Sequence, residues 1–162
     1  MPHLIVKVER QQGQNVQTIH GTVIDVAGSG VVLMGPSGSG KSDLALRLID
    51  RGATLVADDQ FYTRPSRRGL VAFAPDNLYG LFEVRGLGVQ SISAIKTTIL
   101  QLVVNIVAES DVPRIPEPVL SEINGEKIHA IMLNAFENSA PIKIELAVGD
   151  VTRIGKVGKS DG

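Results

Sequence analysis

The chain has 162 residues, a net charge of −1 and 43% hydrophobic residues, which indicates one compact domain with a substantial core. This nearly balanced charge gives no general attraction to nucleic acid or to an anionic membrane, so we expect neither as a partner. Cysteine is absent, no secretory signal is visible, and no apolar stretch approaches the roughly 20 residues of a membrane helix. These features favour a cytoplasmic protein.

Runs of β-branched and apolar residues, bounded by turn residues, predict that most of the chain forms strands. In chain order, the expected strands are residues 3–8, 16–26, 31–34, 54–57, 61–63, 70–73, 97–107, 119–123 and 127–133. Turns are expected at 11–15 and 28–30. The turn residues of Arg64–Gly69 and the pair Asn124–Gly125 predict two hairpins.

Two segments predict helices. Residues 41–51 place Leu44 and Leu48 one turn apart on an apolar face, and Gly52 follows as a cap. Residues 139–149 predict a second helix that ends before Gly149, although the alternation within this segment also fits a strand. We therefore expect an α/β fold with a mixed β-sheet and few helices, as a single domain over 1–150 with a flexible tail at 151–162.

An eight-residue segment between the buried strand 31–34 and the first helix matches the phosphate-loop (P-loop) pattern in full. Its residues are Gly35, Pro36, Ser37, Gly38, Ser39, Gly40, Lys41 and Ser42. Glycines let main-chain N–H groups converge on an anion at the amino end of a helix. Lys41 is expected to contact the terminal phosphates and Ser42 to bind Mg²⁺. The segment predicts binding of ATP with Mg²⁺, but it does not specify a reaction.

A pair of acidic residues, Asp58 and Asp59, ends the strand that follows the first helix. Ends of neighbouring strands meet at one edge of an α/β sheet, so both carboxylates are expected beside the phosphates. One carboxylate can then bind the metal while the other accepts a proton. The competing interpretation is a polar strand end that only caps a loop.

Four segments in this order resemble a known family. They are His20-Gly-Thr-Val-Ile-Asp25, the P-loop, Leu55-Val-Ala-Asp-Asp59 and Glu83-Val-Arg-Gly-Leu-Gly88. They resemble the carboxy-terminal catalytic domain of HPr kinase/phosphorylase, mainly over residues 16–95. The resemblance implies a fold similar to the nucleotide domain of phosphoenolpyruvate carboxykinase, and assembly into hexamers. It implies an ATP-dependent kinase that phosphorylates a serine of HPr, a phosphocarrier of the phosphotransferase system, and removes the phosphate by phosphorolysis.

The resemblance also implies roles for matching residues. Asp58 would accept the proton of the serine hydroxyl, with His20 acting beside it and Lys41 on the phosphates. Ser42, Asp59 and Glu83 would form the metal group. The signature loop comprises Glu83, Arg85, Gly86 and Gly88.

Two departures from the family pattern leave the phosphorylase activity open. The family's amino-terminal domain has no counterpart here, as in the short form of some alphaproteobacteria, and 112–118 lacks the family's Gly-Arg-Asn triplet. Arg114 is the nearest substitute. Two alternatives remain: a nucleotide-sensing regulatory module with little catalysis, or a small-molecule kinase. The arginines at 64, 67 and 68 are expected at an exposed hairpin tip, with recognition of an acidic partner as an alternative.

Overall fold

The computed structural model describes residues 7–11 and 14–159. Its strands are β1 (Lys7–Gln11), β2 (Gln14–His20), β3 (Thr22–Val26), β4 (Ser29–Met34), β5 (Thr54–Ala57), β6 (Gln60–Ser66), β7 (Gly69–Phe73), β8 (Leu81–Val84), β9 (Gly88–Ser91), β10 (Thr98–Ile106), β11 (Val119–Ile123) and β12 (Glu126–Leu133). The α-helices are α1 (Lys41–Asp50) and α2 (Ala140–Lys159), and short 3₁₀ helices are η1 (Asp76–Leu78) and η2 (Glu109–Asp111). Expected residues 3–6 of the first strand and 12–13 of the first turn lie outside the described part.

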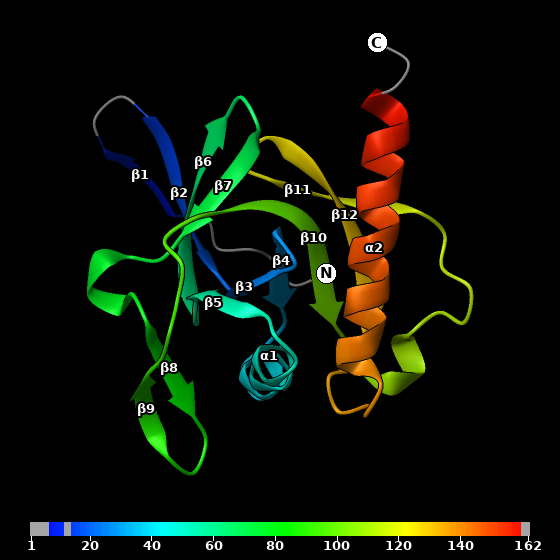
Figure 1. Ribbon diagram of the computed structural model, residues 1–162, viewed down its shortest axis with the longest axis horizontal. Helices are drawn as coiled ribbons and strands as arrows, with labels where there is room; N and C mark the ends of the chain where they lie inside the picture. The colour runs from blue at the N-terminus through cyan, green and yellow to red at the C-terminus, as the bar shows by residue number, and fades with distance from the viewer. Residues whose placement is uncertain (1–6, 12–13, 160–162) are drawn as a thin grey trace.

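Most strands belong to one mixed sheet in the order β1-β2-β6-β7-β10-β4-β3-β5, with β12 and then β11 added beside β10 (Figure 1). The long strand β10 pairs antiparallel with β7 near its start and then runs parallel to both β4 and β12. Helix α1 packs on β3, β4 and β5, and α2 packs on β10 and α1. The expected α/β fold with a mixed sheet and few helices is confirmed.

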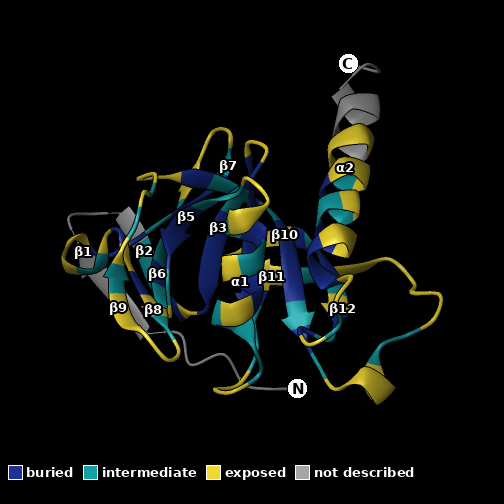
Figure 2. Cartoon of the chain, turned by 60° about the horizontal axis from the view of Figure 1, so that its bottom comes forward, coloured by how far each residue is buried: buried dark blue, intermediate teal, exposed yellow. Residues whose placement is uncertain are grey.

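The central strands are buried on both faces, which explains their continuous apolar sequence (Figure 2). In β4, Val31 and Leu33 belong to the core under the helices, whereas Val32 belongs to the core on the opposite face. Strand β10 contributes to both cores in the same way. The sheet therefore holds the end of β4 rigidly, and the P-loop follows from that end.

The expected strand 16–26 is two strands, β2 and β3, that separate at Gly21. Strand β2 pairs with β6, while β3 pairs with β4 and β5. A side chain at Gly21 would put its Cβ 2.9 Å from Sδ of Met34 and 3.1 Å from the carbonyl oxygen of Leu33. The prediction of one strand was wrong because this close packing comes from residues distant in sequence.

The second helix is confirmed, but its predicted end at Gly149 is wrong, because α2 continues to Lys159. Gly149 is exposed, and a glycine there costs the helix only about 1 kcal/mol relative to alanine. Ile144, Val148 and Val151 keep one apolar stripe on the core across it. The expected tail is thus helical over 151–159, and 160–162 lie outside the described residues.

Two turns are shorter than expected. The turn predicted at 28–30 is formed by Ala27 and Gly28, both with positive φ, and β4 begins at Ser29. The turn predicted at 64–69 contains only residues 67 and 68, because β6 runs to Ser66. Arg64 therefore lies within a strand and not at the hairpin tip.

Within the described part of the chain, no helix is long and apolar enough to cross a membrane.

Candidate functional site

The P-loop connects β4 to α1 and has the backbone shape that its glycines predict. Gly38 and Gly40 have φ values of 81° and 95°, in the left-handed region that favours glycine. A Cβ at Gly40 would also lie only 2.9 Å from Cβ of Ala135. The loop thus needs glycine at Gly40 for two reasons, its backbone angle and the closeness of residues that follow β12.

Lys41, the first residue of α1, folds back along the loop. Its Nζ atom donates hydrogen bonds to the carbonyl oxygens of Gly35 and Pro36, the second at 3.0 Å. Partial burial lowers the pKa of the ammonium below its ordinary value of 10.5, and the Asp59 and Asp58 carboxylates oppose this shift. The positive charge therefore lies between the loop and the acidic pair.

A buried hydroxyl inside the loop lacks a partner. Oγ of Ser39 is the single buried side-chain N or O atom among the described residues without a hydrogen bond. It lies close to Gly35, where an added Cβ would be 2.8 Å away. An unpaired buried hydroxyl is costly. A buried hydroxyl without a partner at the amino end of a helix fits a phosphate ligand, which can accept from the hydroxyl and from the main-chain N–H groups of the helix end.

Asp58 accepts more hydrogen bonds than the other carboxylates of the candidate site. Its Oδ1 accepts hydrogen bonds from the hydroxyls of Ser42 (3.3 Å) and Thr22 (3.2 Å). Its Oδ2 accepts one from the main-chain N–H of Glu83 (3.1 Å). Donors from α1, β3 and β8 thus fix both oxygens next to the end of the P-loop.

The sheet order explains how these residues meet. Strands β4 and β5 are both antiparallel to β3, which lies between them, so the ends of β4 and β5 reach the same edge as the start of β3. This geometry brings Asp58 beside Ser42 at the end of the P-loop, the edge where the sequence places both carboxylates. It also brings in Thr22, which the sequence analysis missed because the position of β3 between the two strands is not a local property.

Asp59 and His20 lie at the same edge but without comparable contacts. Asp59 has a φ of 66°, and its carbonyl accepts a hydrogen bond from the N–H of Gly21 at 3.0 Å. His20 is exposed and pairs with Gln60 in the ladder between β2 and β6. Among the described residues, no hydrogen bond joins His20 to Asp58.

The signature loop forms the hairpin of β8 and β9, which the sequence analysis described only as a loop. Gly86 and Gly88 have φ values of 92° and 84°, and Arg85 is exposed at the turn. Glu83 contacts Asp58 through its main chain, while its side chain is exposed. The hairpin therefore extends from the acidic pair into solvent (Figure 1).

Within the described residues, no three His, Asp or Glu side chains form a cluster able to hold a metal ion by themselves. The oxygen atoms available as metal ligands at the end of the P-loop are the Ser42 hydroxyl and the Asp58 carboxylate, with Asp59 close to Lys41. Mg²⁺ is normally bound by one or two carboxylates together with substrate phosphates. This donor set fits such a shared site and not a metal site made by the protein alone.

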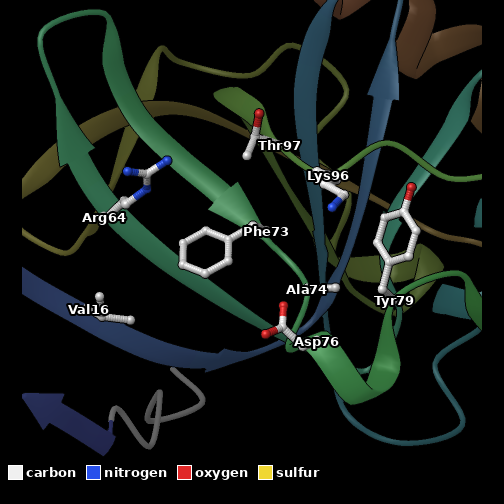
Figure 3. Close-up of a pocket in the computed structure, with 8 residues that line it drawn as sticks. All are labelled: Val16, Arg64, Phe73, Ala74, Asp76, Tyr79, Lys96 and Thr97. Atoms are coloured by element: carbon white, nitrogen blue, oxygen red, sulfur yellow. The ribbon is translucent and has the colours of Figure 1, made fainter. Parts of the chain in front are cut away.

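A separate pocket of about 500 Å³ lies away from the P-loop (Figure 3). Its lining includes Arg64, whose guanidinium lies 5.7 Å from the ring centre of Phe73, and Lys96, which lies 5.9 Å from that of Tyr79. None of its lining residues belongs to the P-loop, the acidic pair or the signature loop. The P-loop edge, where charged and polar groups converge, is the better candidate site.

The fold and this edge define a P-loop domain of the α/β class. The family model of the HPr Serine kinase C-terminal domain matches residues 11–136. The chain belongs to this family.

Proteins named HPr kinase/phosphorylase are similar in sequence to this chain. That of Bordetella avium is 37% identical over 144 residues, covering 81% of this chain and 47% of the relative. That of Peptoclostridium acidaminophilum is 49% identical over 77 residues, covering 47% of this chain and 25% of the relative. The chain thus spans about half or less of the length of these relatives.

A solved structure supports the fold. The Hpr(Ser) kinase/phosphatase from Coxiella burnetii superposes with a TM-score of 0.78 at 23% identity, covering 90% of this chain and 95% of that one.

Proposed function

We propose that this chain is an ATP-dependent protein-serine kinase whose substrate is an HPr-type phosphocarrier protein. The observation that supports this most strongly is the position of Asp58, held by three hydrogen bonds at the end of an intact P-loop. The names of the relatives, which share more than a third of the aligned residues, supply the substrate class.

The P-loop amides and Lys41 would bind the triphosphate, and the buried Ser39 hydroxyl would gain a partner there. Ser42, Asp59 and Glu83 would hold Mg²⁺ together with the phosphates, and the metal would neutralise the charge of the transferred group. The structure supports Ser42 best, because Glu83 presents its main chain to the site. Ser42 would exchange its bond to Asp58 for the metal when the nucleotide binds.

In the transfer step, the serine oxygen forms a bond to the terminal phosphorus while the bond from that phosphorus to the bridging oxygen of ADP breaks. The proton of the serine hydroxyl passes to a carboxylate oxygen of Asp58. Thr22 and the N–H of Glu83 keep that carboxylate in place during the transfer. His20, two residues before Thr22 in the chain, would act beside Asp58 on the incoming serine.

The signature loop, which forms the hairpin of β8 and β9, would help to bind the phosphate of the substrate. Arg85 at its turn supplies a positive charge that suits a phosphoserine or the phosphate being transferred. Gly86 and Gly88 allow the tight turn that presents it. Homo-oligomerisation, which the family resemblance implies, forms part of the proposal.

The test is incubation of the full chain with purified HPr-type protein, ATP and Mg²⁺, followed by intact-mass measurement. The proposal expects a gain of one phosphate on the carrier. Reversal on adding inorganic phosphate would demonstrate the phosphorylase activity as well. ATP binding without a phosphorylated carrier would overturn the kinase assignment in favour of a nucleotide-sensing module, and phosphorylation of a metabolite alone would favour a small-molecule kinase.

A further inference from the structure

An aromatic ring lies exposed against the P-loop on the side away from Asp58. Phe136 follows β12 and is 67% exposed. A methyl group added at Gly40 would lie 3.3 Å from Cε1 of its ring, so the ring edge borders the loop that precedes α1. Single exposed apolar residues are common on protein surfaces. The surroundings of this one distinguish it.

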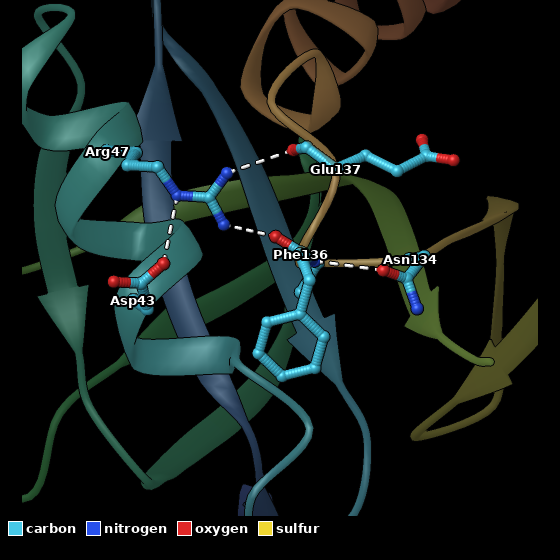
Figure 4. A network of polar contacts seen from close by, with 6 residues as sticks. Asp43, Arg47, Asn134, Phe136 and Glu137 are labelled. Atoms are coloured by element: carbon cyan, nitrogen blue, oxygen red, sulfur yellow. Dashed lines mark hydrogen bonds and ion pairs between the residues drawn. The ribbon is translucent and has the colours of Figure 1, made fainter. Parts of the chain in front are cut away.

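The backbone on both sides of Phe136 is held by polar side chains (Figure 4). Arg47 of α1 donates to the carbonyl oxygens of Ala135 and Glu137, the latter at 3.1 Å, and Asp43 accepts from its Nε at 3.0 Å. These bonds fasten the segment after β12 to the same helix whose amino end carries the P-loop.

A second set of hydrogen bonds holds the backbone of Phe136 itself. Its N–H donates to Oδ1 of Asn134 at 3.0 Å, and Nδ2 of Asn134 donates to the carbonyl of Val107 at 3.0 Å. An exposed ring is therefore displayed from a fixed backbone. A ligand that stacks on such a ring loses little free energy in ordering it.

The sheet order gives the direction of a bound triphosphate. At the edge of the sheet the order is β12, β10, β4, β3, β5, so the P-loop lies between Phe136 on one side and Asp58 on the other. The terminal phosphate must face Asp58 for transfer. The nucleoside end of an extended triphosphate then leaves the loop on the opposite side, where Phe136 lies.

We propose that the ring of Phe136 is the stacking platform for the base of the nucleotide whose phosphates bind the P-loop. This inference rests on the proposed function. A phenyl ring offers a face and no hydrogen-bonding edge, so it accepts adenine and guanine alike and favours purines over the smaller pyrimidines. Stacking of one base corresponds to about a 10- to 100-fold gain in affinity.

The test compares Mg·ATP, Mg·GTP and Mg·tripolyphosphate, which has no base, by titration calorimetry on the full chain. Phe136→Ala is expected to bind both nucleotides about 10- to 100-fold more weakly and tripolyphosphate within twofold of the parent. Leu146→Ala is the matched control, since Leu146 is 65% exposed on α2, and it should change none of the three. Circular dichroism verifies the fold of each variant.

Phe136→Trp supplies a direct readout, because the chain contains no tryptophan. Its emission should be quenched by ATP and not by tripolyphosphate, with ATP affinity kept. Equal weakening of all three ligands by Phe136→Ala, or no weakening of any, would overturn the inference and leave the P-loop assignment standing. A parent protein that binds neither ATP nor tripolyphosphate would overturn the proposed function and this inference with it.

Discussion

The carboxylate of Asp58 accepts a hydrogen bond from the hydroxyl of Ser42 at 3.3 Å, although Asp58 directly follows β5 and Ser42 lies at the start of α1. Ser42 is the last residue of the P-loop, so this contact ties the acidic pair to the phosphate site. Any phosphate bound in the loop therefore lies near a fixed carboxylate, which is the arrangement that transfer to a hydroxyl requires.

Replacing Asp58 tests the proton acceptor. Asp58→Asn keeps the size of the side chain and a carbonyl oxygen for Thr22 and Ser42, but removes the basic group. It also removes the oxygen that accepts from the N–H of Glu83. Transfer to an HPr-type protein should fall about 10²- to 10⁴-fold while ATP affinity stays within a few-fold. Intact-mass kinetics and calorimetry measure the two quantities. Asp76→Asn, at an exposed carboxylate of η1, should leave both unchanged, and undiminished transfer by Asp58→Asn would refute the role.

Thr22 is predicted to position Asp58 without touching the substrate. Thr22→Val keeps the shape of this buried side chain and removes the donor, so transfer should fall by up to about tenfold, the value of one hydrogen bond. Thr22→Ser restores a hydroxyl and should recover most of the rate. A structural role alone would lower the unfolding temperature of both variants and would not separate their rates.

Some elements of this structure can be predicted from local sequence patterns, and others cannot. The P-loop, α1, β5 and the hairpin at Asn124–Gly125 follow from local patterns, and the structure has each of them near the expected residues. The break at Gly21 and the extension of α2 depend on packing against Met34 and on the core stripe of Val148, which no local pattern records.

The site divides in the same way. The sequence places Asp58 at the edge that carries the P-loop, because the ends of neighbouring strands in an α/β sheet meet at one edge. Thr22 and Phe136 were missed because their places depend on sheet order, which puts β3 beside β4 and β12 beside β10. Glu83 was expected to act through its carboxylate, and the structure brings its main-chain N–H to Asp58.

The lowered pKa of Lys41 predicts a pH dependence of nucleotide affinity. Burial lowers this pKa from 10.5, and bound phosphate favours the protonated form. Affinity should therefore be constant below the lowered pKa and fall as the pH rises through it, with a proton taken up on binding there. Calorimetry in two buffers of different ionisation enthalpy detects the uptake. Lys41→Arg stays charged, and its affinity should not fall over the same range.

Arg47 is predicted to stabilise the segment that carries Phe136. Arg47→Ala leaves the carbonyls of Ala135 and Glu137 without their donor, so the free energy of unfolding should drop by about 1–3 kcal/mol. Chemical denaturation measures this drop. Arg51→Ala is the matched control, because Arg51 pairs with Glu145 at the surface, and surface pairs contribute little. Equal losses in the free energy of unfolding from the two substitutions would contradict this stabilising role of Arg47.

The most direct test of the account is calorimetric titration of the parent and of Lys41→Ala with ATP and Mg²⁺, because every proposed role depends on phosphate binding by the P-loop. The account predicts measurable binding by the parent and at least about tenfold weaker binding by the variant, as expected for the loss of one charge-assisted contact. Equal affinity of the two proteins, or no binding by the parent, would contradict it.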